Sequence, residues 1–439
     1  MDCQRAQSLF RHDEPMTSAL LDDLQWRNSI AQTTDRGELE TFLNSGSRSL
    51  YLGVDPTAPS MHLGNLAAFT VLRRFQIAGH RPIALVGGAT GLVGDPSGRN
   101  SERTLNDADV VEEWVGKIRK QLENILDFSG KNSAVMANNL DWTKPVSAIQ
   151  FLRDIGKHFS VNQMLARESV SARLEAGGIS YTEFSYQVLQ AFDYLELSRR
   201  NDCLLQIGGS DQWGNIVAGI DLIRRVEGKS AHALTLPLIT KADGTKFGKT
   251  ATGSIWLDAT MTSPYAFFQF FLNSDDRDVE QLLRSFSFKS HEELNALFDS
   301  LKTNPGAREA HRELAREVTT LIHGESTTQK VENAAKALFG QSEIRDLDEE
   351  TLSSALSELP RTTVTRGEAL PTWVDLITAA GVVDSKSAAR RVIKEGGAYI
   401  NNEKVSGEDF APTTKHLLHG RFLVLRKGKR DLAAVEVAT

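Results

Sequence analysis

Two short motifs carry residue types that bind phosphate. The first is His-Leu-Gly-Asn at residues 62–65, where a strand predicted over 49–54 passes through a turn with Pro56 and Pro59 into a predicted helix. Free N–H groups at a helix start attract phosphate, and a glycine there lets a flat ring approach the backbone. The second is Lys-Phe-Gly-Lys-Thr at residues 246–250, which places two lysines in a glycine-rich loop. Together the motifs predict a site that holds a triphosphate.

A glycine-rich segment at residues 88–98 is a third candidate. It is not a P-loop, because no Lys-Ser or Lys-Thr follows the glycines, and its glycine spacing does not fit a dinucleotide fingerprint. The segment brings Asp95 to the end of a predicted strand, where a carboxylate can accept from a ligand ammonium. Arg99 and Arg103 follow and could bind phosphate. An exposed basic loop is the alternative for this segment taken alone.

The order of the motifs is more specific than any one of them. A lone Gly-Lys pair is weak, because such pairs occur in many surface hairpins. Chance rarely places four polar groups at predicted strand ends of one domain. The groups lie at residues 62–65, 94–95, 209–212 and 246–249.

Alternating strand and helix patterns surround these motifs. Strands are predicted at 49–54 and 81–86, with helices at about 65–78 and 106–126. Another strand, loop and helix unit runs from residue 204 to about 225. This alternation predicts a parallel sheet flanked by helices, with ligands at the carboxyl ends of its strands.

Length and composition predict several domains. A chain of 439 residues is too long for one ordinary core. We expect an N-terminal tail at 1–16, an α/β domain with the parallel sheet at 17–262, a helical domain at 263–339, a loosely packed linker rich in Ser, Glu, Asp and Thr at 340–370, and a small α+β domain at 371–432.

Charge separates the last domain from the rest. The net charge of −7 argues against a protein that coats nucleic acid by bulk charge. Residues 371–431 contain eleven Lys and Arg against seven Asp and Glu, a net charge of +4. A helix predicted over 386–395 places Arg390, Arg391 and Lys394 on one side, which favours RNA binding. A solvated helix face is the alternative on charge alone.

Cysteine content and hydropathy exclude other classes of protein. Cys3 and Cys203 are the only cysteines, so neither a disulfide framework nor a cysteine-based zinc site can form. No run of about 18 apolar residues and no signal-peptide core is present. We therefore expect a cytoplasmic protein without membrane contact.

Three longer stretches resemble a known family. They are Tyr-Leu-Gly-Val-Asp-Pro-Thr at 51–57, Thr-Glu-Phe-Ser-Tyr-Gln-Val-Leu-Gln-Ala-Phe-Asp at 182–193, and Gly-Gly-Ser-Asp-Gln-Trp-Gly-Asn at 208–215. Together with the histidine motif at 62–65 and the lysine motif at 246–250, these stretches resemble the class I aminoacyl-tRNA synthetases, and among them the bacterial tyrosyl-tRNA synthetases. The resemblance covers about residues 19–425 and implies a Rossmann-like catalytic domain. The segment after Pro371 resembles the S4-type RNA-binding module of that family.

The resemblance implies a pocket for L-tyrosine. Tyr51 and Asp193 would hold the phenolic hydroxyl of the substrate. Asp95, Tyr186 and Gln190 would surround its ammonium group, and Gln212 would lie near its carboxylate. The full set implied to bind tyrosine is Tyr51, Asp55, Asp95, Tyr186, Gln190, Asp193 and Gln212.

The resemblance also implies an ATP site. His62 and Thr57 would contact the γ-phosphate side of ATP, Gly64 would lie under the adenine, and Gly209 and Asp211 would bind the ribose. Mg²⁺ would arrive with ATP, since the sequence shows no dedicated carboxylate cage and so no metal site of its own. The implied ATP-binding residues are His62, Gly64, Asn65, Gly209, Asp211, Lys246 and Lys249, and Lys246, Lys249, Arg99 and Arg103 would close on the departing pyrophosphate.

Some positions depart from the family pattern. Asn65 replaces a second histidine, although its amide still donates. Phe247 and Gly248 replace the more general Met-Ser of the lysine motif.

The resemblance implies tRNA(Tyr) binding, here by Arg390, Arg391 and Lys394, and a homodimer through segments such as residues 151–159. A core helix would show similar apolar spacing at 151–159.

Two other functions compete with this interpretation. A tryptophanyl-tRNA synthetase shares the domain plan but gives no reason for the pairing of Tyr51 with Asp193. A catalytically idle, RNA-binding relative would lack catalytic residues, whereas His62, Lys246 and Lys249 are present.

Overall fold

The computed structural model describes residues 20–97, 106–250, 253–365, 367 and 369–438. The chain divides into two compact units. The first contains residues 1–261 and 274–314, and the second contains residues 262–273 and 315–439. The expected tail at 1–16, together with Arg99 and Arg103, lies outside the described residues.

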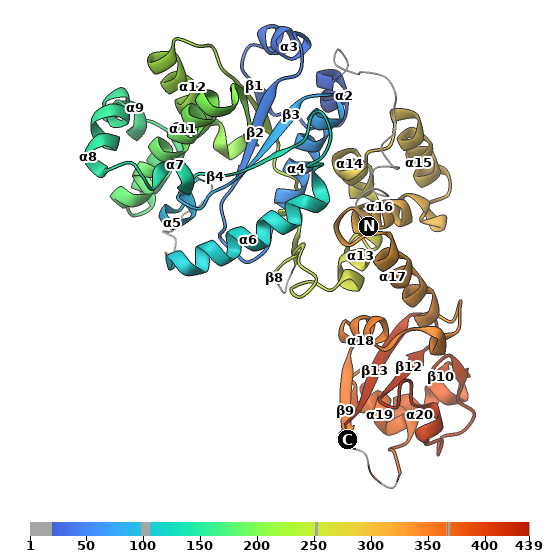
Figure 1. The fold of residues 1–439 in the computed structure, drawn as a ribbon. Coiled ribbons are helices and arrows are strands. Elements are labelled where there is room, and N and C mark those ends of the chain that lie inside the picture. The colour runs from blue at the N-terminus through green and yellow to red at the C-terminus, as the bar shows by residue number, and fades with distance from the viewer. Residues whose placement is uncertain (1–19, 98–105, 251–252, 366, 368, 439) are drawn as a thin grey trace. The chain divides into compact units, whose positions relative to one another are not determined.

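The first unit is built on a six-stranded sheet with the order β1-β6-β5-β2-β3-β4 (Figure 1). Every neighbouring pair from β6 to β4 is parallel, and only the short edge strand β1 is antiparallel. The predicted parallel sheet is therefore confirmed. The strands are β1 (Gln32–Thr33), β2 (Ser49–Val54), β3 (Arg81–Val86), β4 (Val135–Asn138), β5 (Cys203–Gly209) and β6 (His232–Leu236).

Helices cover both faces of this sheet (Figure 1). Helices α4 (Leu63–Ile77) and α6 (Ala108–Ile125) pack together against β2 and β3. Helices α11 (Tyr181–Asn201) and α12 (Trp213–Glu227) pack together against β5. Leu66, Phe69, Leu72 and Phe75 of α4 are buried at the spacing of threes that predicted this helix.

Shorter elements complete the first unit. Helices α14 (Asp276–Phe286) and α15 (His291–Thr303) follow the sheet in sequence but belong to this unit. The others are α2 (Leu20–Trp26), α3 (Arg36–Asn44), α5 (Thr90–Val93), α7 (Leu140–Thr143), α8 (Ala148–Gln150), η2 (Phe151–Ile155), η3 (Gly156–His158), α9 (Val161–Leu165), α10 (Glu168–Ala176), η4 (Ser210–Gln212), β7 (Lys249–Thr250), β8 (Gly253–Ser254) and η5 (Pro305–Ala307), while α16 (Glu309–His323) spans the boundary between the units.

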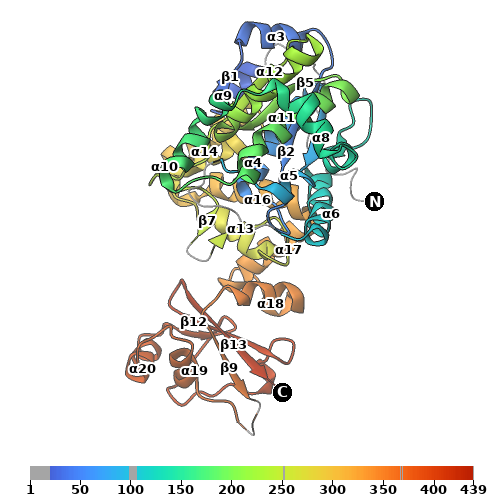
Figure 2. The ribbon, with the colours of Figure 1, turned by 90° about the vertical axis from the view of Figure 1, so that its left-hand side faces the viewer.

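The second unit ends in a five-stranded sheet with the order β11-β10-β12-β13-β9, with α19 (Trp373–Ala379) and α20 (Lys386–Lys394) beside it (Figure 2). The fully buried Trp373 lies in a core shared by both helices and the sheet. The unit also contains α13 (Pro264–Leu272), α17 (Glu325–Leu338), β10 (Ala398–Ile400), β11 (Glu403–Lys404), η7 (Thr414–His416), β12 (Phe422–Lys427) and β13 (Asp431–Ala438).

The segment at 340–370 differs from the loose linker that its composition predicts. It contains η6 (Ile344–Asp346), α18 (Glu349–Ser357) and β9 (Arg361–Thr365), and β9 pairs in parallel with β13. Leu352, Ala355 and Leu356 are buried along one side of α18. These few apolar residues at helical spacing outweigh the polar composition around them.

Candidate active site

His62 closes the amino-terminal end of α4. Its Nδ1 accepts from the N–H groups of Gly64 and Asn65 over 3.1 and 3.4 Å, and Oδ1 of Asn65 accepts from the N–H of His62 over 3.0 Å. Because Nδ1 accepts, the proton of the neutral ring lies on Nε2. Burial lowers the pKa of His62, and the charge of Lys249 adds to this effect. The ring is therefore held neutral, with its Nε2 as a donor.

The amide of Asn65 has a role that its sequence position did not reveal. We predicted a donor at this position, and the structure shows that its oxygen completes a reciprocal helix cap with His62. Gly64 lets the His62 ring approach closely, because a Cβ there would lie 3.0 Å from Cε1 of the ring.

The lysine motif lies against the first motif, 180 residues earlier in the chain. Residues His62 and Trp256 form an antiparallel bridge, and the N–H of Ile255 donates to the carbonyl of Gly248 over 2.9 Å. A Cβ on Gly248 would lie 3.2 Å from Cβ of Leu63, and this glycine has φ of +80°. The side chains of Lys246 and Lys249 are exposed, and the charge of Lys246 acts on Asp211. The structure thus brings the two predicted phosphate motifs together.

A buried carboxylate and a buried phenol form the inner part of a cluster of polar residues. Asp193 on α11 accepts from Nδ2 of Asn139 and Nε1 of Trp142, each over 2.9 Å. Burial raises the pKa of Asp193 to about 7, although both donors oppose that shift. Burial and then Asp193 raise the pKa of Tyr51 well above its usual value. Among the described residues the Tyr51 hydroxyl has no hydrogen-bond partner, so a ligand hydroxyl would satisfy it.

Asp55 accepts hydrogen bonds from two further residues of this cluster. Its Oδ2 accepts from the Tyr186 hydroxyl over 2.7 Å and its Oδ1 accepts from Oγ1 of Thr90 over 2.6 Å. Nδ2 of Asn139 donates in turn to Thr90 over 2.9 Å. Gly87 allows this arrangement, since a Cβ there would lie 2.1 Å from Asp55. Asp55, predicted to bind tyrosine, thus orients Tyr186.

The outer part of this cluster lies after α5 and after β5. Asp95 accepts from Nε2 of Gln212 over 2.7 Å and from the N–H of Ser97 over 2.9 Å. Asp211 lies at the end of β5 in η4, and its pKa is raised by burial and then by Asp95. A Cβ on Gly209 would lie 2.5 Å from Oδ1 of Asp211, so any larger residue would displace this carboxylate from its present position.

Not every predicted residue joins this cluster. Thr57 is exposed on the turn after β2, and its N–H donates to the carbonyl of Asp55 over 2.9 Å. Oε1 of Gln190 on α11 is buried without a partner in the described part of the chain. The three basic residues of α20 lie in the second unit; they are Arg390, Arg391 and Lys394.

Several residues of this cluster were not predicted from the sequence. Thr90 donates to Asp55, and Asn139 and Trp142 donate to the buried Asp193. Gln206 pairs with Tyr51 in the register of β2 and β5. Oε1 of Gln206 is also buried without a partner among the described residues. Asn139 directly follows the carboxyl end of β4, so the rule that ligands gather at strand ends could have found it.

The fold and the site define a class I tRNA synthetase. The family model described as tRNA synthetases class I (W and Y) matches residues 44–340, and the tyrosine–tRNA ligase SYY-like C-terminal domain matches residues 351–435. Tyrosine–tRNA ligase of Streptomyces avermitilis is 59% identical over 420 residues, which are 95% of this chain and 99% of that protein. That of Corynebacterium glutamicum is 53% identical, with 95% and 99% covered. The chain belongs to the tyrosine–tRNA ligase family of class I synthetases.

Solved structures agree with this assignment. A C-terminally truncated mitochondrial tyrosyl-tRNA synthetase from Aspergillus nidulans matches with a TM-score of 0.67 and 30% identity, covering 77% of this chain and 97% of that one. A tryptophanyl-tRNA synthetase from Encephalitozoon cuniculi matches with a TM-score of 0.52 at 13% identity, covering 80% and 97%, which shows a shared fold.

Proposed function

We propose that this chain binds tyrosine between Tyr51 and Asp193, activates it with ATP and transfers the tyrosyl group to tRNA. The observation that carries the proposal is the buried Asp193 carboxylate beside the unpartnered Tyr51 hydroxyl. A phenolic hydroxyl placed between them donates to Asp193 and interacts with Tyr51. Phenylalanine would leave the Tyr51 hydroxyl without a partner, at about 1–3 kcal/mol, and would offer no donor to the Asp193 carboxylate beside it.

The other end of the amino acid meets the outer residues. Asp95 and Tyr186 offer oxygen atoms to an ammonium group, and the buried Oε1 of Gln190 supplies a third acceptor. Gln212 donates to Asp95 over 2.7 Å, and we assign it the substrate carboxylate. A zwitterionic amino acid with a phenol side chain therefore fits this set of residues.

The two motifs would hold the phosphates of ATP. The tyrosine carboxylate is already charged, so it attacks the α-phosphorus directly while pyrophosphate leaves. His62, Thr57, Lys246 and Lys249 would stabilise the charge that grows on the pyrophosphate, and we assign Arg99 and Arg103 the same role. Gly64 and Asn65 would contact the nucleotide, and Gly209 and Asp211 would bind the ribose.

Mg²⁺ would bind through the ATP phosphates. The described residues contain no group of three or more His, Cys, Asp or Glu side chains that could hold a metal. When bound, the ion supplies positive charge to the phosphates.

Helix α20 is the proposed contact for tRNA. Arg391 is 76% exposed and Lys394 is 73% exposed, while Arg390 and Lys394 lie 3.4 and 3.3 Å from Glu408. These surface ion pairs are weak and screened by salt, so phosphates of RNA can compete with Glu408 for both cations.

We also propose a homodimer, formed through α8 to α11. Among the described residues of this region, six large apolar side chains are exposed, and exposed apolar area of this kind is typical of an interaction surface when it is contiguous. This region lies on the opposite side of the first unit from α14 and α15 (Figure 1). The side chains are Ile149, Leu152, Val161, Leu165, Leu174 and Tyr181. Only monomer in sedimentation at micromolar concentration would contradict the dimer.

No helix in the described part of the chain is long and apolar enough to cross a membrane. We propose a cytoplasmic location because ATP and tRNA are available there.

ATP–pyrophosphate exchange tests the proposed function directly. Tyrosine, phenylalanine and tryptophan are offered separately at equal concentration. We expect exchange with tyrosine and at least a hundredfold less with the other two, because neither of them offers a phenolic hydroxyl to the buried Tyr51 hydroxyl and the Asp193 carboxylate. Exchange with tryptophan but not with tyrosine would overturn the assignment.

A further inference from the structure

The loop that carries the two lysines contacts helix α14 at two places. The N–H of Ala242 donates to Oδ1 of Asp278 over 2.7 Å, before the motif. Inside the motif, the ring of Phe247 lies 6.1 Å from the ring of Phe286, at an angle of 42°. Asp278 and Phe286 are eight residues apart, or about 12 Å along a helix. One helix therefore contacts both the start of the loop and the segment between the lysines.

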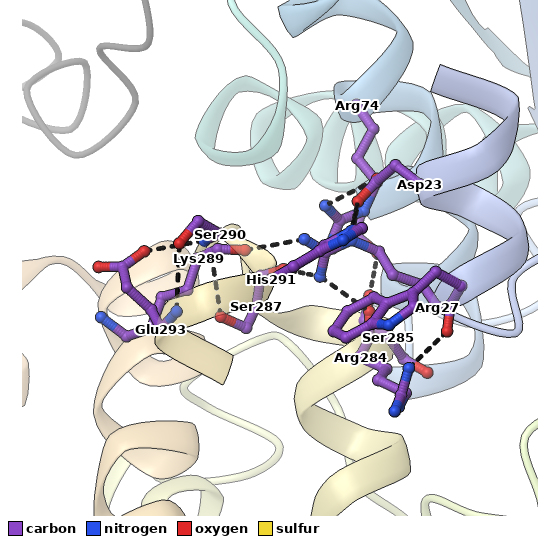
Figure 3. Close-up of polar contacts among 12 residues, drawn as sticks. Asp23, Arg27, Arg74, Arg284, Ser285, Ser287, Lys289, Ser290, His291 and Glu293 are labelled. Atoms are coloured by element: carbon purple, nitrogen blue, oxygen red, sulfur yellow. Dashed lines mark hydrogen bonds and ion pairs between the residues drawn. The ribbon is translucent and has the colours of Figure 1, made fainter. Parts of the chain in front are cut away.

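The end of α14 is fastened to α4, the helix that His62 caps. The guanidinium of Arg74 on α4 donates to the carbonyl of Ser287, just after α14 (Figure 3). The last carbonyls of a helix have no partner inside it, and a cation there also complements the negative end of the helix dipole. The position of α14 is thus tied to the element that carries the first motif.

Helix α2 adds a second buried attachment at the same place. Arg27 donates to the carbonyls of Ser287 and Lys289 over 3.1 and 2.8 Å, and its side chain is only 3% exposed. Asp23 holds Arg27 over 2.8 Å and lies 2.7 Å from Nε2 of His291 (Figure 3). Moving this turn would strip a buried guanidinium of its partners, which is costly, so the network resists displacement of α14.

We propose that α14 sets the position of the lysine motif relative to His62, and that Asp278 and Phe286 are positioning residues for tyrosine activation. The proposal rests on the proposed function. Neither residue contacts substrate. Asp278 binds the backbone at Ala242 and Phe286 contacts the ring of Phe247, and these contacts set the positions of Lys246 and Lys249. A displacement of about 1 Å in a group that binds the transition state can lower the rate about 10²-fold.

The test compares two carboxylates in the first turn of α14. Asp278→Ala removes the acceptor of Ala242, whereas Asp278→Asn keeps an oxygen that can accept from it. Asp276→Ala is the matched control, because Asp276 lies 3.0 Å from Nε2 of His311 instead. In ATP–pyrophosphate exchange we expect Asp278→Ala to lower kcat about tenfold with the KM for tyrosine within twofold of wild type. Asp278→Asn should recover most of kcat, and Asp276→Ala should keep it.

A coupling measurement separates positioning from a general structural effect. In a Lys246→Ala/Lys249→Ala background neither lysine of the motif is left to position, so Asp278→Ala should change kcat by less than twofold. Phe286→Leu should lower kcat in the wild-type background and lose its effect in the same way.

Three results would overturn the proposal while the wild type is active. They are wild-type kcat in Asp278→Ala, an equal loss in Asp276→Ala, and a full tenfold loss in the lysine-free background. A wild-type chain without tyrosine-dependent exchange would instead refute the proposed function, and this proposal with it.

Discussion

Asn139 is expected to keep Asp193 ionised, and Asn139→Ala tests this part of the tyrosine pocket. Its two amide hydrogens reach Oδ2 of Asp193 and Oγ1 of Thr90, each over 2.9 Å, and its Oδ1 accepts from the N–H of Ala89 over 2.7 Å. The side chain is fully buried. The substitution therefore removes a hydrogen bond from a buried carboxylate.

The size of the effect follows from the environment of Asp193. Burial raises its pKa to about 7, and the hydrogen bonds from Asn139 and Trp142 lower it. A hydrogen bond to a charged group is worth about 1.5–3 kcal/mol, and one pKa unit corresponds to about 1.4 kcal/mol. Loss of Asn139 should raise the pKa of Asp193 by about one to two units. At pH 7.5 its ionised fraction would then fall from about three quarters to about one quarter or less.

Tyrosine-dependent pyrophosphate exchange from pH 6 to 9.5 measures this change. The acid limb of kcat/KM reports ionisation in the free enzyme, and we expect it to move to higher pH by about one to two units in Asn139→Ala. Activity should recover largely at the alkaline end. Asn138→Ala is the matched control, since Oδ1 of Asn138 accepts from the N–H of Leu140 instead, and its acid limb should stay in place.

A different pH profile would refute this reasoning. If Asn139→Ala lowers kcat/KM equally at every pH, then Asn139 only shapes the pocket. If the acid limb also moves in Asn138→Ala, the shift does not come from the hydrogen bond to Asp193.

Three further predictions concern other parts of the molecule. Burial raises the folded pKa of Asp193 from 3.8 to about 7, so the stabilisation from the protonated carboxyl is complete below about pH 4 and is lost as the pH rises through about 7. The free energy of unfolding in urea should therefore fall by about 4 kcal/mol between pH 4 and 8 in wild type relative to Asp193→Asn. Parallel pH profiles of the two proteins would contradict this. Lys249→Ala should lower kcat of exchange by about 10²-fold, because it removes charge stabilisation in the transition state; a change confined to the tyrosine Kd in equilibrium dialysis would count against this role. Arg390→Ala/Arg391→Ala/Lys394→Ala should raise the KM for tRNA, reduce its salt dependence and leave exchange unchanged; aminoacylation at wild-type KM would remove α20 from the tRNA contact.

Local patterns in the sequence were sufficient for the main architecture. Alternating strands and helices predicted the parallel sheet, and the buried apolar residues of α4 match their predicted spacing. The same patterns predicted Asp95 and Asp211 at strand ends; Asp211 follows β5 directly in η4, whereas Asp95 follows the short helix α5 that comes after β3. The composition of residues 340–370 was a weaker guide, because average polarity hides the few buried residues that form α18.

Contacts between distant segments needed the tertiary structure. Asn139 and Trp142 bind Asp193 from more than 50 residues away, and no spacing in the sequence indicates this. Gly248 has a positive φ and lies on Leu63, so the two phosphate motifs pack together directly. The contact of Asp278 with Ala242 likewise depends on where α14 folds back.

The sequence by itself determined which chemical groups this protein carries and the order of the elements that present them, because helix and strand periodicity are local properties. The tertiary structure decided the state of those groups: a neutral His62 that caps its own helix, an Asp193 whose pKa is about 7, and an Asp55 bound to Tyr186. Burial and hydrogen bonding set these states, and both depend on residues that only the folded chain brings together.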